Sequence, residues 1–142
     1  MDEIFAWNDR YEMKEDEPDR EHKQLIKLTN TFLTAFSQGK AQPILDVVMN
    51  EVQEYARNHF KNEEKAMRTY DHSGFITMKD FNDVLIRELG MFRSTYVDGK
   101  LGPDEVEPYM KEWVLRHMRL QRKLKVTRAA RLKKAREEQQ KS

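Results

Sequence analysis

The residues most able to do chemistry in this sequence are a histidine and a glutamate four positions apart, His59 and Glu63. Positions i and i+4 share one face of an α-helix, so both side chains can reach a common metal ion. Imidazole and carboxylate groups on inward helix faces are the usual metal ligands of helical bundles. A single inward histidine is nevertheless more often a hydrogen-bonded core residue than a ligand. The pair alone therefore leaves both interpretations open.

Apolar residues recur at helical spacing in four segments, separated by Gly39, Ser73-Gly74, Gly99 and Gly102-Pro103. This pattern predicts helices over about 19–38, from Pro43 to at least Met67, from Phe75 to about Val97, and from Pro103 to near Arg136. The second helix is expected to turn inward Ile44, Val48, Val52, Tyr55, His59, Glu63 and Met67. The third should bury Phe75, Met78, Asn82, Leu85, Leu89 and Phe92, and the fourth Val106, Tyr109, Met110, Trp113, His117, Leu120 and Leu124.

Four amphipathic helices with short connections predict an all-α fold, an antiparallel up-down-up-down four-helix bundle. A length of 142 residues is that of one domain. We expect an N-terminal arm over 1–18, the bundle over 19–121 and a basic helical tail over 122–142. The aromatic residues of the arm, Phe5, Trp7 and Tyr11, should cover the bundle as plugs.

Composition narrows the function classes. The chain has no cysteine, which excludes disulfides, thiolate metal sites and thiol catalysis. It has no phosphate-binding glycine loop and no HExxH motif, so we expect a protein that is not an enzyme. Neither a signal segment nor a run of apolar residues long enough for a membrane span is present, which favours a cytoplasmic protein.

The two ends of the chain carry opposite charge, although the net charge is only +1. Residues 1–21 hold nine acidic and three basic side chains, and residues 122–142 hold nine basic and two acidic ones. Either end could bind a protein partner, and the candidate contacts in the tail are Arg128, Arg131, Lys133 and Lys134. The tail lacks aromatic residues, so nucleic-acid binding by base stacking is not expected. A solvated extension is the alternative.

Several motifs in order resemble the bacterial hemerythrins over nearly 125 residues. Phe5-x-Trp7 with Tyr11 is similar to the aromatic arm of that family, and Asp19-Arg20-Glu21-His22 to its first ligand helix. The most specific string is His59-Phe60-Lys61-Asn62-Glu63-Glu64-x-x-Met67. Trp113-x-x-x-His117 resembles the last ligand helix.

In that family five histidines and two bridging carboxylates hold two irons, one of which has an open position for O2. The resemblance implies His22 and His59 as ligands to one iron, Glu63 as a bridge and His117 as a ligand to the other. Two further histidines and a second bridging aspartate should follow. Their positions are occupied by Met78, Asn82 and Arg122.

These three substitutions predict that reversible di-iron O2 binding is lost, because a thioether, an amide and a guanidinium are poor ligands for such irons. The main hypothesis is a metal-free protein-interaction scaffold. In it Arg122 turns inward to pair with Glu63, Asn82 adds a hydrogen bond and Met78 fills the vacated volume. No cofactor is then required.

The alternative hypothesis is a mononuclear metal-binding or metal- and oxygen-sensing protein. His22, His59, Glu63 and His117 form a set of three nitrogens and one oxygen, which suits a single Fe or Zn ion. It requires all four groups to converge, although the resemblance places His117 beside the other iron.

Overall fold

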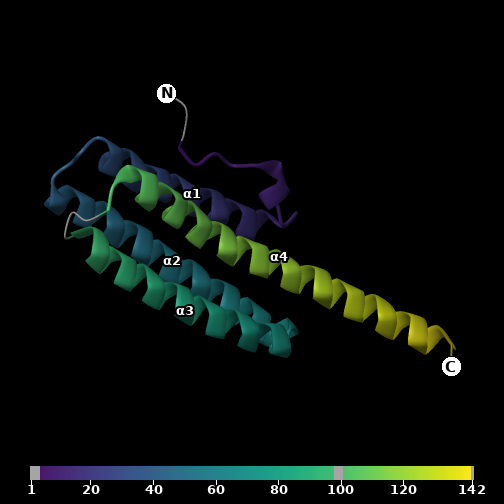
Figure 1. Cartoon of the computed structure of the whole chain (residues 1–142). Coiled ribbons are helices and arrows are strands. Elements are labelled where there is room, and N and C mark those ends of the chain that lie inside the picture. The colour runs from purple at the N-terminus through teal and green to yellow at the C-terminus, as the bar shows by residue number, and fades with distance from the viewer. Residues whose placement is uncertain (1–3, 98–100, 142) are drawn as a thin grey trace.

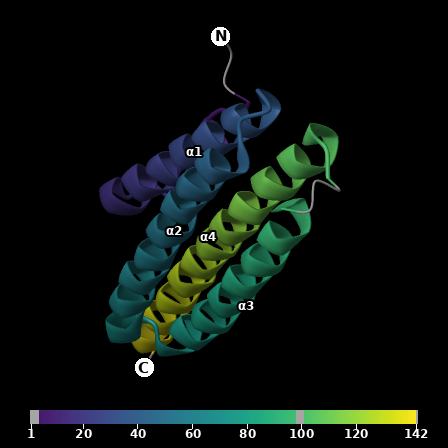
Figure 2. The same ribbon diagram turned by 90° about the vertical axis from the view of Figure 1, so that its left-hand side faces the viewer.

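The computed structural model describes residues 4–97 and 101–141. They form a short 3-10 turn, η1 (Asp9–Tyr11), and four α-helices: α1 (Asp16–Ser37), α2 (Gln42–Tyr70), α3 (His72–Val97) and α4 (Pro103–Lys141) (Figure 1). Each helix packs against its chain neighbours, and α4 closes the ring against α1 (Figure 2). The described part of the chain contains no strand. The predicted all-α four-helix bundle is confirmed.

Local sequence explains where α1 and α2 begin and end. Gly39 adopts a left-handed φ of 69°, and the Lys40 N–H reaches back to the Ala35 carbonyl at 3.1 Å, so α1 ends in a Schellman cap as Gly39 predicts. Pro43 lies in the first turn of α2, also as predicted. Helix α1 begins at Asp16 rather than at 19 because Pro18 fits within its first turn.

The predicted break at Ser73-Gly74 is wrong. A single non-helical residue, Asp71, separates α2 from α3, and both Ser73 and Gly74 lie in the first turn of α3. The buried Asp71 carboxylate accepts the Gly74 N–H at 3.1 Å and therefore caps α3. Its Oδ1 also pairs with Arg131 of α4 at 2.9 Å. The expected break at Gly99 lies outside the described residues.

The buried face of α3 is the predicted one, since all six expected residues are buried. The prediction for α2 fails in its first two turns. Ile44 is 48% exposed, whereas Leu45 and Met49 are buried. The segment Ile44-Leu45-Asp46-Val47-Val48 has apolar residues on both faces, so periodicity does not distinguish the buried side there.

The N-terminal arm covers the bundle as expected. Phe5 is buried, its N–H donates to the Asn30 side chain at 2.6 Å, and Trp7 and Tyr11 pack against the core. At the other end of the arm, Glu15 pairs with Lys125 of α4 at 3.0 Å. The arm is thus fixed to both α1 and α4.

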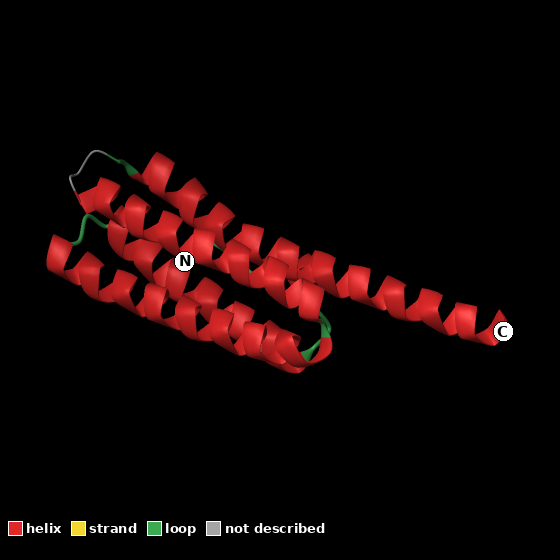
Figure 3. Cartoon of the chain, turned by 90° about the horizontal axis from the view of Figure 1, so that it is seen from below, coloured by secondary structure: helices red, strands yellow, loops and turns green. Residues whose placement is uncertain are grey.

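Helix α4 continues beyond the ends of the other helices (Figures 1 and 3). It ends at Lys141 rather than near Arg136, and residues 132–141 are all exposed. Arg128 and Arg131 contact the bundle itself: both face Asp71, and Arg128 lies 4.5 Å from the centre of the Tyr70 ring. Lys133 and Lys134 are exposed. A partner-binding role for the tail stays a prediction.

None of the described helices combines the length and the apolar character that crossing a membrane requires.

Candidate metal centre

Three helices bring the four predicted donors into one buried cluster. His22 comes from α1, His59 and Glu63 from α2, and His117 from α4. All four are buried, and one ligand atom from each lies within 4.8 Å of the others. Among the described residues, these four form the one group of three or more histidines and carboxylates able to share an ion. The convergence that a single-ion site requires is therefore present.

Three of the donor atoms form a compact triangle. The Nε2 atoms of His59 and His117 lie 3.1 Å apart, and Glu63 Oε2 lies 3.4 Å from the first and 3.1 Å from the second. Metal bonds of about 2.0–2.1 Å place neighbouring ligand atoms about 3.3 Å apart in a tetrahedral site and about 3.0 Å apart in an octahedral one. The triangle thus has the dimensions of one face of a coordination shell.

Asn82 contacts the outer nitrogen of His117. Its Oδ1 lies 2.8 Å from His117 Nδ1, and its Nδ2 donates to Glu64 Oε2 at 3.1 Å. The amide oxygen can only accept, so the His117 Nδ1 carries a proton and the neutral ring has its lone pair on Nε2. Asn82 thus makes its hydrogen bonds to His117 and Glu64 and none to Glu63.

His59 also has a carboxylate behind it. Glu21 Oε1 lies 3.5 Å from His59 Nδ1, on the ring side opposite to Glu63. Burial lowers the pKa of His59, but the carboxylates of Glu21 and Glu63 on its two sides outweigh burial and raise the pKa to about 9. The Nε2 atoms of His59 and His117 face each other at 3.1 Å, so they cannot both carry a proton. In the metal-free protein the proton between them therefore belongs to His59.

His22 and Glu63 have polar atoms without a hydrogen-bond partner. Both ring nitrogens of His22 and the Oε1 of Glu63 are buried without a hydrogen bond. Burial, together with repulsion from His117 and His59, lowers the pKa of His22 to about 3, so this ring is neutral. Unpartnered buried atoms of this kind are rare and costly in native proteins. The donor set of three imidazoles and one carboxylate, with free lone pairs, fits one divalent ion.

The other two substituted positions do not contribute donors. Met78 is fully buried beside Met67 and Phe75. Arg122 is half-buried with its Nε unpartnered, and no ion pair joins it to Glu63 within the described chain. The predicted Arg122–Glu63 salt bridge is wrong: the charged contacts of Glu63 are with His59 and His117, both through Oε2.

We expect the metal-free protein to be most stable near pH 6.5, the ordinary histidine pKa. Above it, folded His59 keeps a proton that the unfolded chain loses, so stability falls as pH rises to about 9. Below it, folded His22 stays neutral while the unfolded chain binds a proton, so stability falls as pH drops toward 3. We call the falling parts of the stability curve above and below pH 6.5 the alkaline and the acidic limb. Along each limb the free energy of unfolding should change by about 1.4 kcal/mol per pH unit.

Urea unfolding in chelator from pH 5 to 9 measures both limbs. His59→Gln should abolish the alkaline limb and leave the acidic limb in place. A wild-type protein whose alkaline limb matches that of His59→Gln would contradict the assignment of the shared proton.

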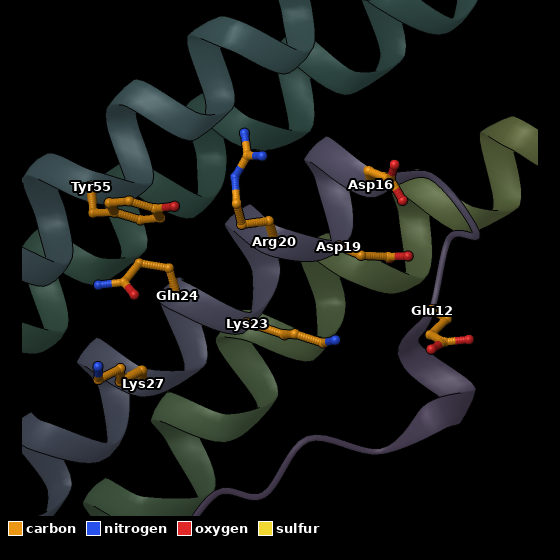
Figure 4. Close-up of a pocket in the computed structure, with 8 residues that line it drawn as sticks. All are labelled: Glu12, Asp16, Asp19, Arg20, Lys23, Gln24, Lys27 and Tyr55. Carbon is orange, nitrogen blue, oxygen red and sulfur yellow. The ribbon is translucent and has the colours of Figure 1, made fainter.

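The arm and α1 form a surface groove that is separate from this cluster. Three acidic and three basic side chains surround it, together with Gln24 and Tyr55 (Figure 4): Glu12, Asp16, Asp19, Arg20, Lys23 and Lys27. None of the four clustered donors lines it. The acidic arm therefore borders a surface of mixed charge.

Comparison with known proteins gives one consistent result. The chain is 26% identical over 121 residues to a bacteriohemerythrin of Clostridium acetobutylicum, covering 81% of this chain and 93% of that protein. It is 23% identical to a bacteriohemerythrin of Stenotrophomonas maltophilia, over 82% of this chain and 75% of that one. It is 24% identical to myohemerythrin-1 of Phascolopsis gouldii, over 82% and 87%.

No family model matches the sequence, and no solved structure gives a significant match. The similarity to bacteriohemerythrins and to a myohemerythrin nevertheless extends over most of the chain, and the four helices form the corresponding bundle around the His and Glu cluster. The chain therefore contains a hemerythrin-like domain.

Proposed function

We propose that this protein binds a single divalent metal ion, Fe²⁺ or Zn²⁺, through His22, His59, Glu63 and His117. The observation that carries the proposal is the triangle of His59 Nε2, His117 Nε2 and Glu63 Oε2, with sides of 3.1 to 3.4 Å. His22 adds a neutral ring with both nitrogens unpartnered. When bound there, such an ion supplies a Lewis-acidic centre and, in the case of iron, a redox-active one.

The same observations argue against two ions. A di-iron centre of the kind that the resemblance implies needs seven protein ligands, and four donors converge here. Asn82 bonds to His117 and Glu64 instead of facing the cluster as a ligand, and Met78 packs among apolar side chains. We therefore infer that reversible di-iron O2 binding has been lost.

Metal titration of the purified, chelator-treated protein tests this function. Zn²⁺, Fe²⁺ under anaerobic conditions, and Co²⁺ as a spectroscopic probe should each bind with one equivalent per chain, measured by equilibrium dialysis and elemental analysis. Co²⁺ should give visible bands typical of nitrogen and oxygen ligands. Two bound irons per chain with absorption bands of a bridged pair would contradict the proposal, as would the absence of any bound metal.

A metal-free interaction scaffold is the second candidate. The observation that favours it is the exposed end of α4, where residues 132–141 project beyond the bundle with Lys133 and Lys134 accessible. The proton of His59 also compensates the negative charge of Glu63 without an ion. If the titration finds no metal, the scaffold becomes the preferred function, with a protein partner that binds the basic tail.

A further inference from the structure

We propose that Asn82 is a positioning residue for the metal ion, linking Glu64 to His117 and fixing the ring of His117 in the tautomer that presents its Nε2 lone pair. The inference rests on the proposed function. Helix α3 contributes none of the four clustered donors, so Asn82 is its contribution to the site. A position where the resemblance implies a metal ligand would thereby have become a support for one.

The first step is the orientation of the amide. An ionised carboxylate only accepts hydrogen bonds, so the Glu64 Oε2 contact at 3.1 Å must come from the NH2 group of Asn82. That contact turns the amide oxygen toward His117. Asn82 is fully buried, and the two ends of its amide have separate partners, Glu64 at the nitrogen and His117 at the oxygen.

The second step is the proton on His117. The Asn82 oxygen accepts from Nδ1 at 2.8 Å, which leaves Nε2 unprotonated in the neutral ring. This Nε2 faces Glu63 Oε2 and His59 Nε2, at 3.1 Å from each. Histidine ligands commonly donate their outer N–H to a carboxylate or carbonyl, which fixes the tautomer and increases ligand basicity. Loss of such a partner typically costs 10- to 100-fold in metal affinity.

His59 also has an oxygen atom near its outer nitrogen: Glu21 Oε1 lies 3.5 Å from Nδ1, which is an ion-pair distance without a hydrogen bond. Glu21 in turn accepts from Asn62 at 3.3 Å. Two of the three histidines thus have an oxygen atom on the side that faces away from the cluster, an amide oxygen at His117 and a carboxylate oxygen at His59. This second outer oxygen supports an arrangement directed at an ion.

Nitrogen NMR of the metal-free protein tests the tautomer without any metal. In wild type, His117 should be protonated at Nδ1. Asn82→Leu, which keeps the volume and removes the acceptor, should shift the ring toward the Nε2–H form. Asn82→Asp combined with Glu64→Gln keeps an acceptor at the same place and turns the Glu64 position into a donor, so this double variant should restore the Nδ1–H form. A wild-type His117 protonated at Nε2, or a tautomer unaffected by Asn82→Leu, would overturn the inference.

Zn²⁺ affinity, measured by competition with a chromophoric chelator, tests the consequence. We expect a 10- to 100-fold weaker affinity in Asn82→Leu and a value within about threefold of wild type in the double variant Asn82→Asp with Glu64→Gln. Equal affinity of wild type and Asn82→Leu would overturn the positioning role. If wild type binds no Zn²⁺, the proposed function fails and the metal role of Asn82 fails with it, while the NMR result still decides whether Asn82 fixes the tautomer.

Discussion

Saturating Zn²⁺ should raise the melting temperature of this protein by about 10 °C. A ligand present at a thousand times its dissociation constant stabilises the folded state by about 4 kcal/mol. For a domain of this size each kcal/mol corresponds to about 3 °C. Glu63→Gln should reduce the shift to less than about 2 °C, because it removes the carboxylate that neutralises the ion in a buried site.

His72→Gln is the matched control for this experiment. His72 is the histidine outside the cluster, and it is exposed at the start of α3. Its variant should keep the full Zn²⁺-induced shift, as measured by differential scanning calorimetry with and without chelator. A shift that disappears in His72→Gln, or that persists in Glu63→Gln, would place the ion somewhere other than the predicted cluster.

Gly74→Ala should lower the free energy of unfolding by about 2–3 kcal/mol, estimated from the loss of a helix cap and of a buried carboxylate's partners. A Cβ at this position would lie 2.3 Å from Asp71 Oδ2 and 2.7 Å from its Cγ. The Asp71 side chain has no easy way to move, because it caps α3 and pairs with Arg131. Urea denaturation of the chelator-treated protein measures the loss.

Gly90 provides a control of opposite sign in the same helix. A Cβ at Gly90 meets no atom within 4 Å. Alanine there should raise the free energy of unfolding by about 0.5–1 kcal/mol, because it restricts the unfolded chain and favours the helix. Equal effects of Gly74→Ala and Gly90→Ala would show that the close approach to Asp71 does not constrain the junction.

Those features that depend on local chemistry could be predicted from the sequence. Gly39 and Pro43 mark the α1–α2 turn because a left-handed backbone and a missing N–H are properties of single residues. The α3 stripe from Phe75 to Phe92 was predicted correctly because its members recur at alternating spacings of three and four residues, although Ile76 and Met91 are exposed elsewhere on the helix. The donors His59 and Glu63 followed from a spacing of four residues, and His22 and His117 from the resemblance.

The features that could not be predicted depend on contacts between helices. Asp71, and not Ser73-Gly74, separates α2 from α3. Its carboxylate accepts a hydrogen bond from Arg131, which is 60 residues away in the sequence. The contacts of Asn82 could not be predicted because its partners, His117 and Glu64, lie on two other helices. A sequence pattern assigns a residue to a face, whereas the hydrogen bond that it makes depends on the neighbouring helices.

The donors of the candidate centre come from distant parts of the chain, positions 22, 59, 63 and 117. An ion held there would tie α1, α2 and α4 together and close two long loops, one between His22 and His59 and one between Glu63 and His117. Unlike a covalent cross-link, such an ion leaves on unfolding, so it would stabilise the fold by its binding free energy rather than by restricting the unfolded chain. In a protein without cysteine, the ion would serve as the reversible counterpart of a disulfide, and its supply would set how firmly the three helices stay joined.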